Sequence, residues 1–225
     1  MQDGAPVRAV VGALVLLALA LAAPSAEAQG RGGRAGDFDF YVLALSWSPS
    51  YCANAGERAD RTQCGAGKGY AFVTHGLWPQ YERGFPRDCR VTGRNPTRAQ
   101  VDGMLDIMPS PGLVRHEWRT HGTCSGLDPA SYFGQVRAAY GRVVIPEELR
   151  SADEDRDMSP ADIERAFIGA NRGMKPSGIA VVCKGGALQE VRICMTDGLD
   201  FRPCAEVDRK ACRAERISVP AAGSR

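Results

Sequence analysis

The sequence groups ionisable side chains in one short segment, His116-Glu117-Trp118-Arg119-Thr120-His121-Gly122-Thr123-Cys124. On a helix, about 100° of rotation per residue leaves the two histidines about 140° apart, with Glu117 between them on the same face. The chain has one further histidine, His75. A single histidine on such a face is typical of a structural role. Two histidines and a glutamate are costly to bury together, so this group predicts a reactive or binding site.

A zinc site is the first alternative, because His116 to His121 superficially resembles the H-E-x-x-H motif of zinc proteases. In that motif the two histidines stand four positions apart, about 40° around the helix. His116 and His121 stand five positions apart. The spacing therefore argues against a metal site, and we expect no cofactor.

Apolar spacing outward from this segment predicts helices at residues 96–108, 113–120, 130–141 and 159–170. Pro109 stops the first, and Gly122 marks the end of the second as a left-handed C-cap. Ser159 and Pro160 open the last helix as its N-cap and first helical residue. The charged residues 151–158 predict a loop.

Strands are predicted towards both ends of the chain, at residues 38–47, 70–74, 179–183 and 188–195. The last two form a hairpin around the turn Lys184-Gly185-Gly186-Ala187. Residues 48–50 predict a turn, and residues 52–69 predict a loop held by cysteines. This order predicts an α+β fold with a central, mainly antiparallel β-sheet and flanking helices, in a single disulfide-bonded domain.

The N-terminal residues have the features of a signal peptide. Arg8 precedes an apolar run at residues 9–23, and Ala26-Glu27-Ala28 offers small residues at both positions that a signal peptidase reads. A membrane anchor is the alternative, but this run is shorter than the roughly 20 apolar residues that span a bilayer. We therefore expect a signal peptide at 1–28 cleaved near Ala28, a flexible lead at 29–36, a domain at 37–225, and a secreted or periplasmic protein without a membrane anchor.

Length and composition set further limits. With 225 residues, 44% of them hydrophobic, the chain can bury one substantial core. The net charge of +2 is too small for a protein that coats nucleic acid through charge alone. Eight cysteines in an exported chain predict four disulfides, and spacing alone leaves their pairing open.

Two segments resemble the active-site segments of the ribonuclease T2 family. They are His75-Gly76-Leu77-Trp78-Pro79-Gln80 and the segment 116–124. Further matches lie at residues 45–52, 108–110 and 188–194. The resemblance thus covers essentially the whole predicted domain.

The resemblance implies an endoribonuclease that cleaves single-stranded RNA by transesterification through 2′,3′-cyclic phosphates, without a metal ion and with low base specificity. His121 would be the general base and His75 the general acid, while His116 and Glu117 would hold the phosphate and stabilise the transition state. Histidine suits proton transfer at neutral or mildly acid pH. Because the nucleophile is the substrate's own 2′-hydroxyl, we expect no cleavage of DNA. We also expect a monomer.

The same resemblance suggests substrate-binding residues and disulfide partners. Trp78 is a candidate for stacking on a base, with core packing as the alternative. Gln80 and Phe85 would border the same base pocket, and Pro109 with Ser110 a second one. The implied disulfides are Cys52–Cys64, Cys89–Cys124, Cys183–Cys212 and Cys194–Cys204.

One residue departs from the family pattern, because Thr120 stands where the family commonly has a lysine before the last histidine. A cation for the transition state is therefore missing at this position, and neither Arg115 nor Arg119 is a clear replacement. An exported RNA-binding protein without catalysis is the alternative that this departure leaves open. The presence of all three histidines favours the enzyme.

Overall fold

The structure is a computed structural model that describes residues 33–91 and 95–222. The predicted signal peptide and its cleavage site lie outside the described residues. At the end of the predicted lead, the Gly36 N–H donates to the Cys124 carbonyl over 2.9 Å. Among the described residues, no helix combines the length and apolar character that a membrane span requires.

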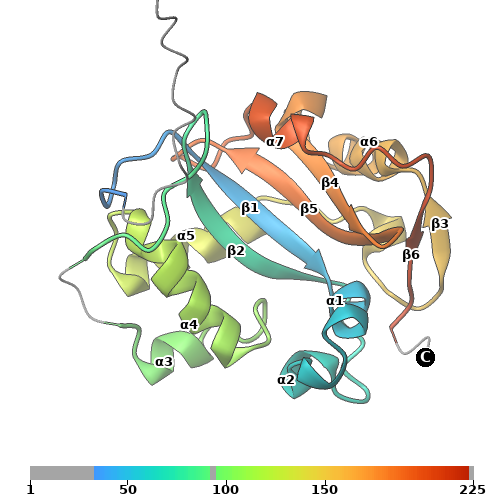
Figure 1. The fold of residues 1–225 in the computed structure, drawn as a ribbon, viewed down its shortest axis with the longest axis horizontal. Coiled ribbons are helices and arrows are strands. Elements are labelled where there is room, and N and C mark those ends of the chain that lie inside the picture. The colour runs from blue at the N-terminus through green and yellow to red at the C-terminus, as the bar shows by residue number, and fades with distance from the viewer. Residues whose placement is uncertain (1–32, 92–94, 223–225) are drawn as a thin grey trace, which may run out of the picture.

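A mainly antiparallel sheet forms the centre of the domain (Figure 1). Strand β1 (Phe40–Trp47) lies between β2 (Phe72–Gln80) and β5 (Ala187–Met195), and β4 (Ile179–Lys184) pairs with β5. These pairings are antiparallel, and β5 makes one parallel pairing with a short further strand. The predicted α+β class with a mainly antiparallel sheet is confirmed.

Both faces of the sheet are covered, which explains why β1 is apolar at nearly every position. Tyr41, Leu43 and Leu45 contribute to the larger core, which also contains side chains from α4, α5 and α6. Phe40 and Val42 point to a smaller core that includes Val207 of α7. Alternate residues of a strand face opposite sides, so β1 supplies both cores.

The predicted helices are present with adjusted ends. They are α3 (Arg98–Asp102), α4 (Pro111–Thr120), α5 (Pro129–Gly141) and α6 (Pro160–Ala170). A further helix that was not predicted, α7 (Ala205–Arg209), follows β5. Two short 3₁₀ turns, η3 (Glu147–Leu149) and η4 (Pro176–Gly178), flank α6. Ser159 caps α6 as predicted, since its hydroxyl accepts the Asp162 N–H. The helix predicted at 96–108 ends early at Asp102 and continues as turns.

Two segments predicted as irregular contain regular structure. The predicted turn and loop at 48–69 instead form α1 (Ser48–Ala55), the turn η1 (Gly56–Arg58) and α2 (Arg61–Cys64). Proline is favoured in the first helical turn, so Pro49 starts α1 rather than a turn. In the predicted loop 151–158, β3 (Arg156–Met158) pairs with β6 (Ile217–Val219), which lies about sixty residues away in the sequence.

The prediction of a left-handed C-cap at Gly122 is wrong. His121 occupies the C-cap of α4 with φ of −120°, and Gly122 begins the 3₁₀ turn η2 (Gly122–Cys124). A Cβ atom on Gly122 would lie 2.6 Å from the Trp118 ring and 2.9 Å from Tyr132. Close packing, rather than backbone conformation, therefore requires glycine here.

All four implied disulfides are confirmed, and they are Cys52–Cys64, Cys89–Cys124, Cys183–Cys212 and Cys194–Cys204. The Cys89–Cys124 bridge connects the segment that follows β2 to the end of α4. It therefore ties the chain beyond β2 to η2, the turn that directly follows His121.

Candidate active site

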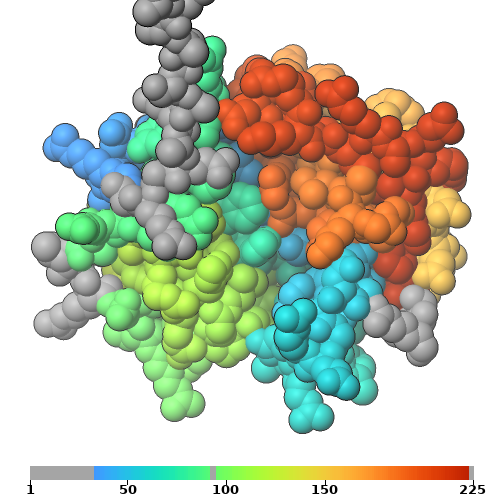
Figure 2. Space-filling model, in the orientation of Figure 1, coloured from blue at the N-terminus to red at the C-terminus, as the bar shows by residue number. Residues whose placement is uncertain are grey.

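A cavity of about 330 Å³ brings all three histidines together. In the space-filling view, the surface of β2 is visible between α4, in yellow-green, and the C-terminal strands, in orange (Figure 2). The cavity is lined by Phe40, His75, Trp78, Gln80, Tyr81, Phe85, Arg87, His116, Glu117, Thr120, His121, Arg192, Glu206, Val207 and Lys210. A larger cavity, of about 760 Å³ beside α1 and α2, contains no histidine.

His75 occupies a β-bulge in β2. Ala44 of β1 pairs with Gly76, but the next residue, Leu45, pairs with Thr74, so His75 has no partner in β1. A bulge inserts one extra residue and redirects its side chain, and such irregularities are common beside active sites. The imidazole of His75 remains 36% exposed on the edge of the cavity.

Glu117 is buried against β2 and is held by two groups from that strand. Its side chain is 1% exposed, and the Trp78 indole N–H donates to Oε2 over 2.7 Å. Its Oε1 lies 3.6 Å from His75 Nε2. A Cβ atom on Gly76 would come within 2.0 Å of Glu117 Oε2, so the carboxylate requires glycine at this position.

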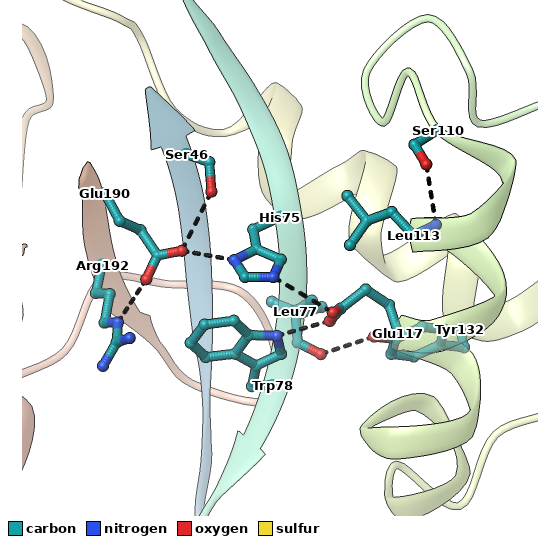
Figure 3. Close-up of polar contacts among 10 residues, drawn as sticks. All are labelled: Ser46, His75, Leu77, Trp78, Ser110, Leu113, Glu117, Tyr132, Glu190 and Arg192. Carbon is teal, nitrogen blue, oxygen red and sulfur yellow. Dashed lines mark hydrogen bonds and ion pairs between the residues drawn. The ribbon is translucent and has the colours of Figure 1, made fainter. Parts of the chain in front are cut away.

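His75 has a second carboxylate neighbour on its other side (Figure 3). Its Nδ1 lies 2.7 Å from Oε1 of Glu190, a residue of β5. The Glu190 carboxylate is buried, and it also accepts hydrogen bonds from the Ser46 hydroxyl and from Arg192 Nε. The two ring nitrogens of His75 therefore face two different glutamates.

Trp78 packs against His121. Its ring stacks on His121, with 5.2 Å between centroids and 29° between planes. It also meets His75 edge to face and lies below the Arg192 guanidinium. Nδ1 of His121 is buried and accepts or donates no hydrogen bond within the described part of the chain. Stacking on the Trp78 indole therefore holds the His121 ring in place, although no hydrogen bond to Nδ1 does so among the described residues.

The histidines experience opposite electrostatic environments. Burial, together with the positive charges of His75 and His116, lowers the pKa of His121 to about 3. Burial also lowers the pKa of His75, but the hydrogen bond and charge of Glu190 and the charge of Glu117 more than offset it, so the pKa of His75 is raised. At mildly acid pH, His121 is therefore neutral while His75 is protonated.

The remaining two groups also titrate away from their ordinary values. Burial and the charge of Arg119 lower the pKa of His116. Burial raises the pKa of Glu117 to about 7, even though the charge of His75 and the Trp78 hydrogen bond act in the opposite direction. Glu117 therefore carries a proton for much of its time at acid pH.

Most of the predicted site residues lie together. His75, His116, Glu117 and His121 border one cavity, as do Trp78, Gln80 and Phe85. Pro109 and Ser110 do not line it. The Ser110 hydroxyl caps α4 by accepting the Leu113 N–H and bonds to Asp60, while the Pro109 carbonyl accepts from the Thr62 hydroxyl.

The sequence reasoning missed Glu190 and Arg192. Both lie in the segment 188–194 that carried part of the family resemblance, but neither was assigned a role. A usable signal was present, because a glutamate inside a strand of apolar residues has to find a partner when it is buried. The identity of that partner depends on the pairing of β5 with β1, which places Glu190 beside Ser46.

An α+β domain whose cavity holds paired imidazoles and carboxylates has the groups of an acid–base enzyme. Residues 38–204 match the model of the ribonuclease T2 family. The chain belongs to the ribonuclease T2 family, a family of RNA endonucleases. The predicted family and enzyme class are thus confirmed.

Individual relatives agree with this assignment. A ribonuclease of Aeromonas hydrophila is 48% identical over 204 residues, which cover 88% of this chain and 90% of the relative. Ribonuclease DdI of Dictyostelium discoideum is 28% identical over 91% of this chain and 95% of its own length. Among solved structures, trichomaglin, an S-like ribonuclease, superposes with a TM-score of 0.68 at 21% identity, covering 84% of this chain and all of its own. This last similarity concerns the fold.

Proposed function

We propose that this protein is an exported endoribonuclease that cleaves single-stranded RNA through a 2′,3′-cyclic phosphate, without a metal ion and with low base specificity. The observation that carries the proposal is the placement of His75 and His121 in one cavity, with His75 Nδ1 2.7 Å from the Glu190 carboxylate and His121 stacked on Trp78. A neutral His121 with a pKa of about 3 can accept a proton, and a His75 with a raised pKa can donate one.

The reaction needs one proton removed and one delivered. His121 takes the proton of the 2′-hydroxyl as the 2′-oxygen attacks phosphorus. The bond from phosphorus to the 5′-oxygen then breaks, and His75 protonates that oxygen from Nε2. The products are a 2′,3′-cyclic phosphate and a free 5′-hydroxyl, with His121 protonated and His75 neutral. Water attack on the cyclic phosphate can reverse both roles.

His116 and Glu117 are proposed to hold the phosphate. A buried carboxyl whose pKa is about 7 is largely protonated at mildly acid pH. In that form it donates a hydrogen bond to a phosphate oxygen instead of repelling it. The same protonation explains how a carboxyl group can lie beside an anionic substrate.

Base binding is proposed at the part of the cavity that Trp78, Gln80 and Phe85 border. Pro109 and Ser110 remain candidates for a second base site outside this cavity. RNase NT, one of the structurally similar proteins, was solved with bound 5′-AMP, at 22% identity and a TM-score of 0.56. This supports a nucleotide-sized ligand for the fold. We further propose that the protein is exported, that residues 1–28 are removed, and that it acts as a monomer.

The test is to incubate the mature protein with single-stranded RNA and with DNA of matching sequence in excess chelator, followed by analysis of the product ends. We expect cleavage of RNA alone, with 2′,3′-cyclic ends. RNA binding without cleavage would instead support the non-catalytic alternative that Thr120 raised. Cleavage that requires an added divalent metal, or cleavage of DNA, would contradict the histidine mechanism.

A further inference from the structure

Glu190 is a buried carboxylate that the mechanism above does not use. It lies on β5 with a relative exposure of 4%, and burial of a carboxylate is unfavourable unless its charge is compensated. Compensation comes from two cations, because Oε1 lies 2.7 Å from His75 Nδ1 and Oε2 accepts from Arg192 Nε over 2.8 Å. The Ser46 hydroxyl provides one more donor, at 3.3 Å from Oε1.

The contact between Glu190 and His75 determines which ring nitrogen is free. A carboxylate accepts hydrogen bonds, so Nδ1 of His75 has to carry a proton. Nε2 is then the nitrogen that points towards the cavity, where Glu117 Oε1 lies 3.6 Å away. Figure 3 shows the imidazole of His75 between the two carboxylates, with the Trp78 ring beside it.

We propose that Glu190 is a positioning residue for the general acid: it fixes the His75 ring through Nδ1 and holds Nε2 protonated for the departing 5′-oxygen, while Arg192 keeps the Glu190 carboxylate in place. This inference rests on the function proposed above, in which His75 is the acid. A second partner that orients a histidine is a recurring device in acid–base sites.

The charges around His75 favour this role. Burial raises the pKa of Glu190, but the His75 hydrogen bond and the charge of Arg192 outweigh it, so the carboxyl stays ionised. Glu190 and Glu117 both favour the protonated form of His75. Arg192 from β5 opposes it. His116 and His121 from the end of α4 also carry a proton less readily when His75 is charged. Glu190 is the carboxylate in direct hydrogen-bond contact, so its removal should matter most.

A purely structural role is the competing explanation, since a buried ion pair can serve stability alone. The two roles differ in their dependence on the leaving group. An acid is needed when the departing group is the 5′-oxygen of a nucleoside, and it is not needed when the group is 4-nitrophenolate, which leaves without a proton. A structural defect would slow both reactions.

The experiment compares Glu190→Gln with wild type on a dinucleoside phosphate and on uridine 3′-(4-nitrophenyl phosphate). We expect kcat on the dinucleoside phosphate to fall about ten- to a hundredfold, and kcat on the aryl ester to stay within about threefold. The alkaline limb of the pH profile should move to lower pH on the dinucleoside phosphate. Glu190→Asp, which keeps the charge, should restore most of that limb.

The matched control is Glu164→Gln. Glu164 lies on α6, accepts the Val181 N–H and is not among the residues that line the cavity, so this variant should leave both rates unchanged. Equal losses of Glu190→Gln on both substrates with an unmoved alkaline limb would overturn the proposal, as would full activity on the dinucleoside phosphate. If Glu190→Gln does not fold, the ¹⁵N NMR chemical shifts of His75 in the wild-type protein provide the test. Neutral His75 should carry its proton on Nδ1. A neutral ring with the proton on Nε2 would contradict the proposal.

His75→Ala separates this inference from the proposed function. A large loss on the dinucleoside phosphate together with a small loss on the aryl ester would support His75 as the acid, and the Glu190 result then decides the inference alone. Equal behaviour of His75→Ala on both substrates would refute the acid assignment itself.

Discussion

Gly76 and Glu117 lie so close together that no side chain at position 76 is compatible with the observed carboxylate, since a Cβ atom would come within 2.0 Å of Oε2. The glycine thus belongs to the active site although it contributes no functional group. It allows α4 to approach β2 closely enough for Trp78 to donate to Glu117.

Gly76→Ala should therefore displace Glu117 and lower kcat on RNA. We expect a loss of stability of about 1–3 kcal/mol, as for other overpacked sites, because the added Cβ would meet the buried Glu117 carboxylate and the Trp78 indole. The matched control is Gly134→Ala in α5, where a Cβ meets nothing within 4 Å. Denaturant unfolding and initial rates check both variants. A Gly76→Ala protein with wild-type kcat would show that Glu117 can relocate without cost.

The pH dependence of kcat/KM should form a broad bell. Activity rises with pH as His121 loses its proton, and the pKa of about 3 places this limb in strongly acid solution. Activity falls as Glu117 and His75 lose their protons, because both are proposed to act in their protonated forms. The pKa of Glu117 is about 7, and the pKa of His75 is raised above the ordinary histidine value. Because the ionisable groups of the site interact, each limb gives an apparent pKa of the coupled site and not of one residue. Rates measured in constant ionic strength buffers test this, and inactivity at about pH 5 would contradict it.

Glu117→Gln should lower activity and raise stability at neutral pH. The folded pKa of about 7 exceeds the ordinary value of 4.5, so the folded state binds more protons, and stability is lost as pH rises through this window. The variant should therefore gain about 3 kcal/mol over wild type between pH 4.5 and 7. Urea unfolding at both ends of the window measures this gain, with the exposed Glu148→Gln as control. A constant difference across the window would refute the pKa shift.

Thr120→Lys should raise turnover, because it supplies the transition-state cation that the family commonly has at this position. Thr120 lines the same cavity as the histidines. The uncharged Thr120→Met variant controls for the longer side chain and should show no gain. Steady-state kcat on one dinucleoside phosphate measures the effect. An unchanged or lower kcat for Thr120→Lys would refute the prediction that a cation at position 120 raises turnover.

Loss of the Cys89–Cys124 disulfide should reduce activity as well as stability, because this bridge joins the segment after β2 to the end of α4. The control is loss of Cys52–Cys64, which lies beside the other cavity and should reduce stability alone. The loops span 35 and 12 residues, so chain entropy predicts about 1 kcal/mol more destabilisation for the first pair. Melting curves and kcat of the two Cys→Ser double variants test this. Equal kcat values in the folded variants would contradict the positioning role.

Local patterns in the sequence were sufficient for much of the fold. Apolar spacing and capping residues identified α4, α5 and α6, because helix periodicity and Ser–Pro starts depend on neighbours along the chain. Gly185 and Gly186 identified the β4–β5 hairpin, because turn preference also depends on neighbours along the chain. Both glycines adopt the positive φ that such a turn requires. The grouping of His116, Glu117 and His121 predicted a site, and the family motifs implied their roles, the role of His75 and the disulfide partners.

Only the tertiary structure decided how these groups act together. Glu190 reaches His75 from 115 residues away, and no periodicity records that contact. The bulge at His75 depends on the register between two strands, and the need for glycine at 122 depends on the approach of Trp118 and Tyr132. Local sequence sets backbone preference and amphipathic pattern. Proton affinity, in contrast, is set by burial and by charges that come together only when distant segments pack.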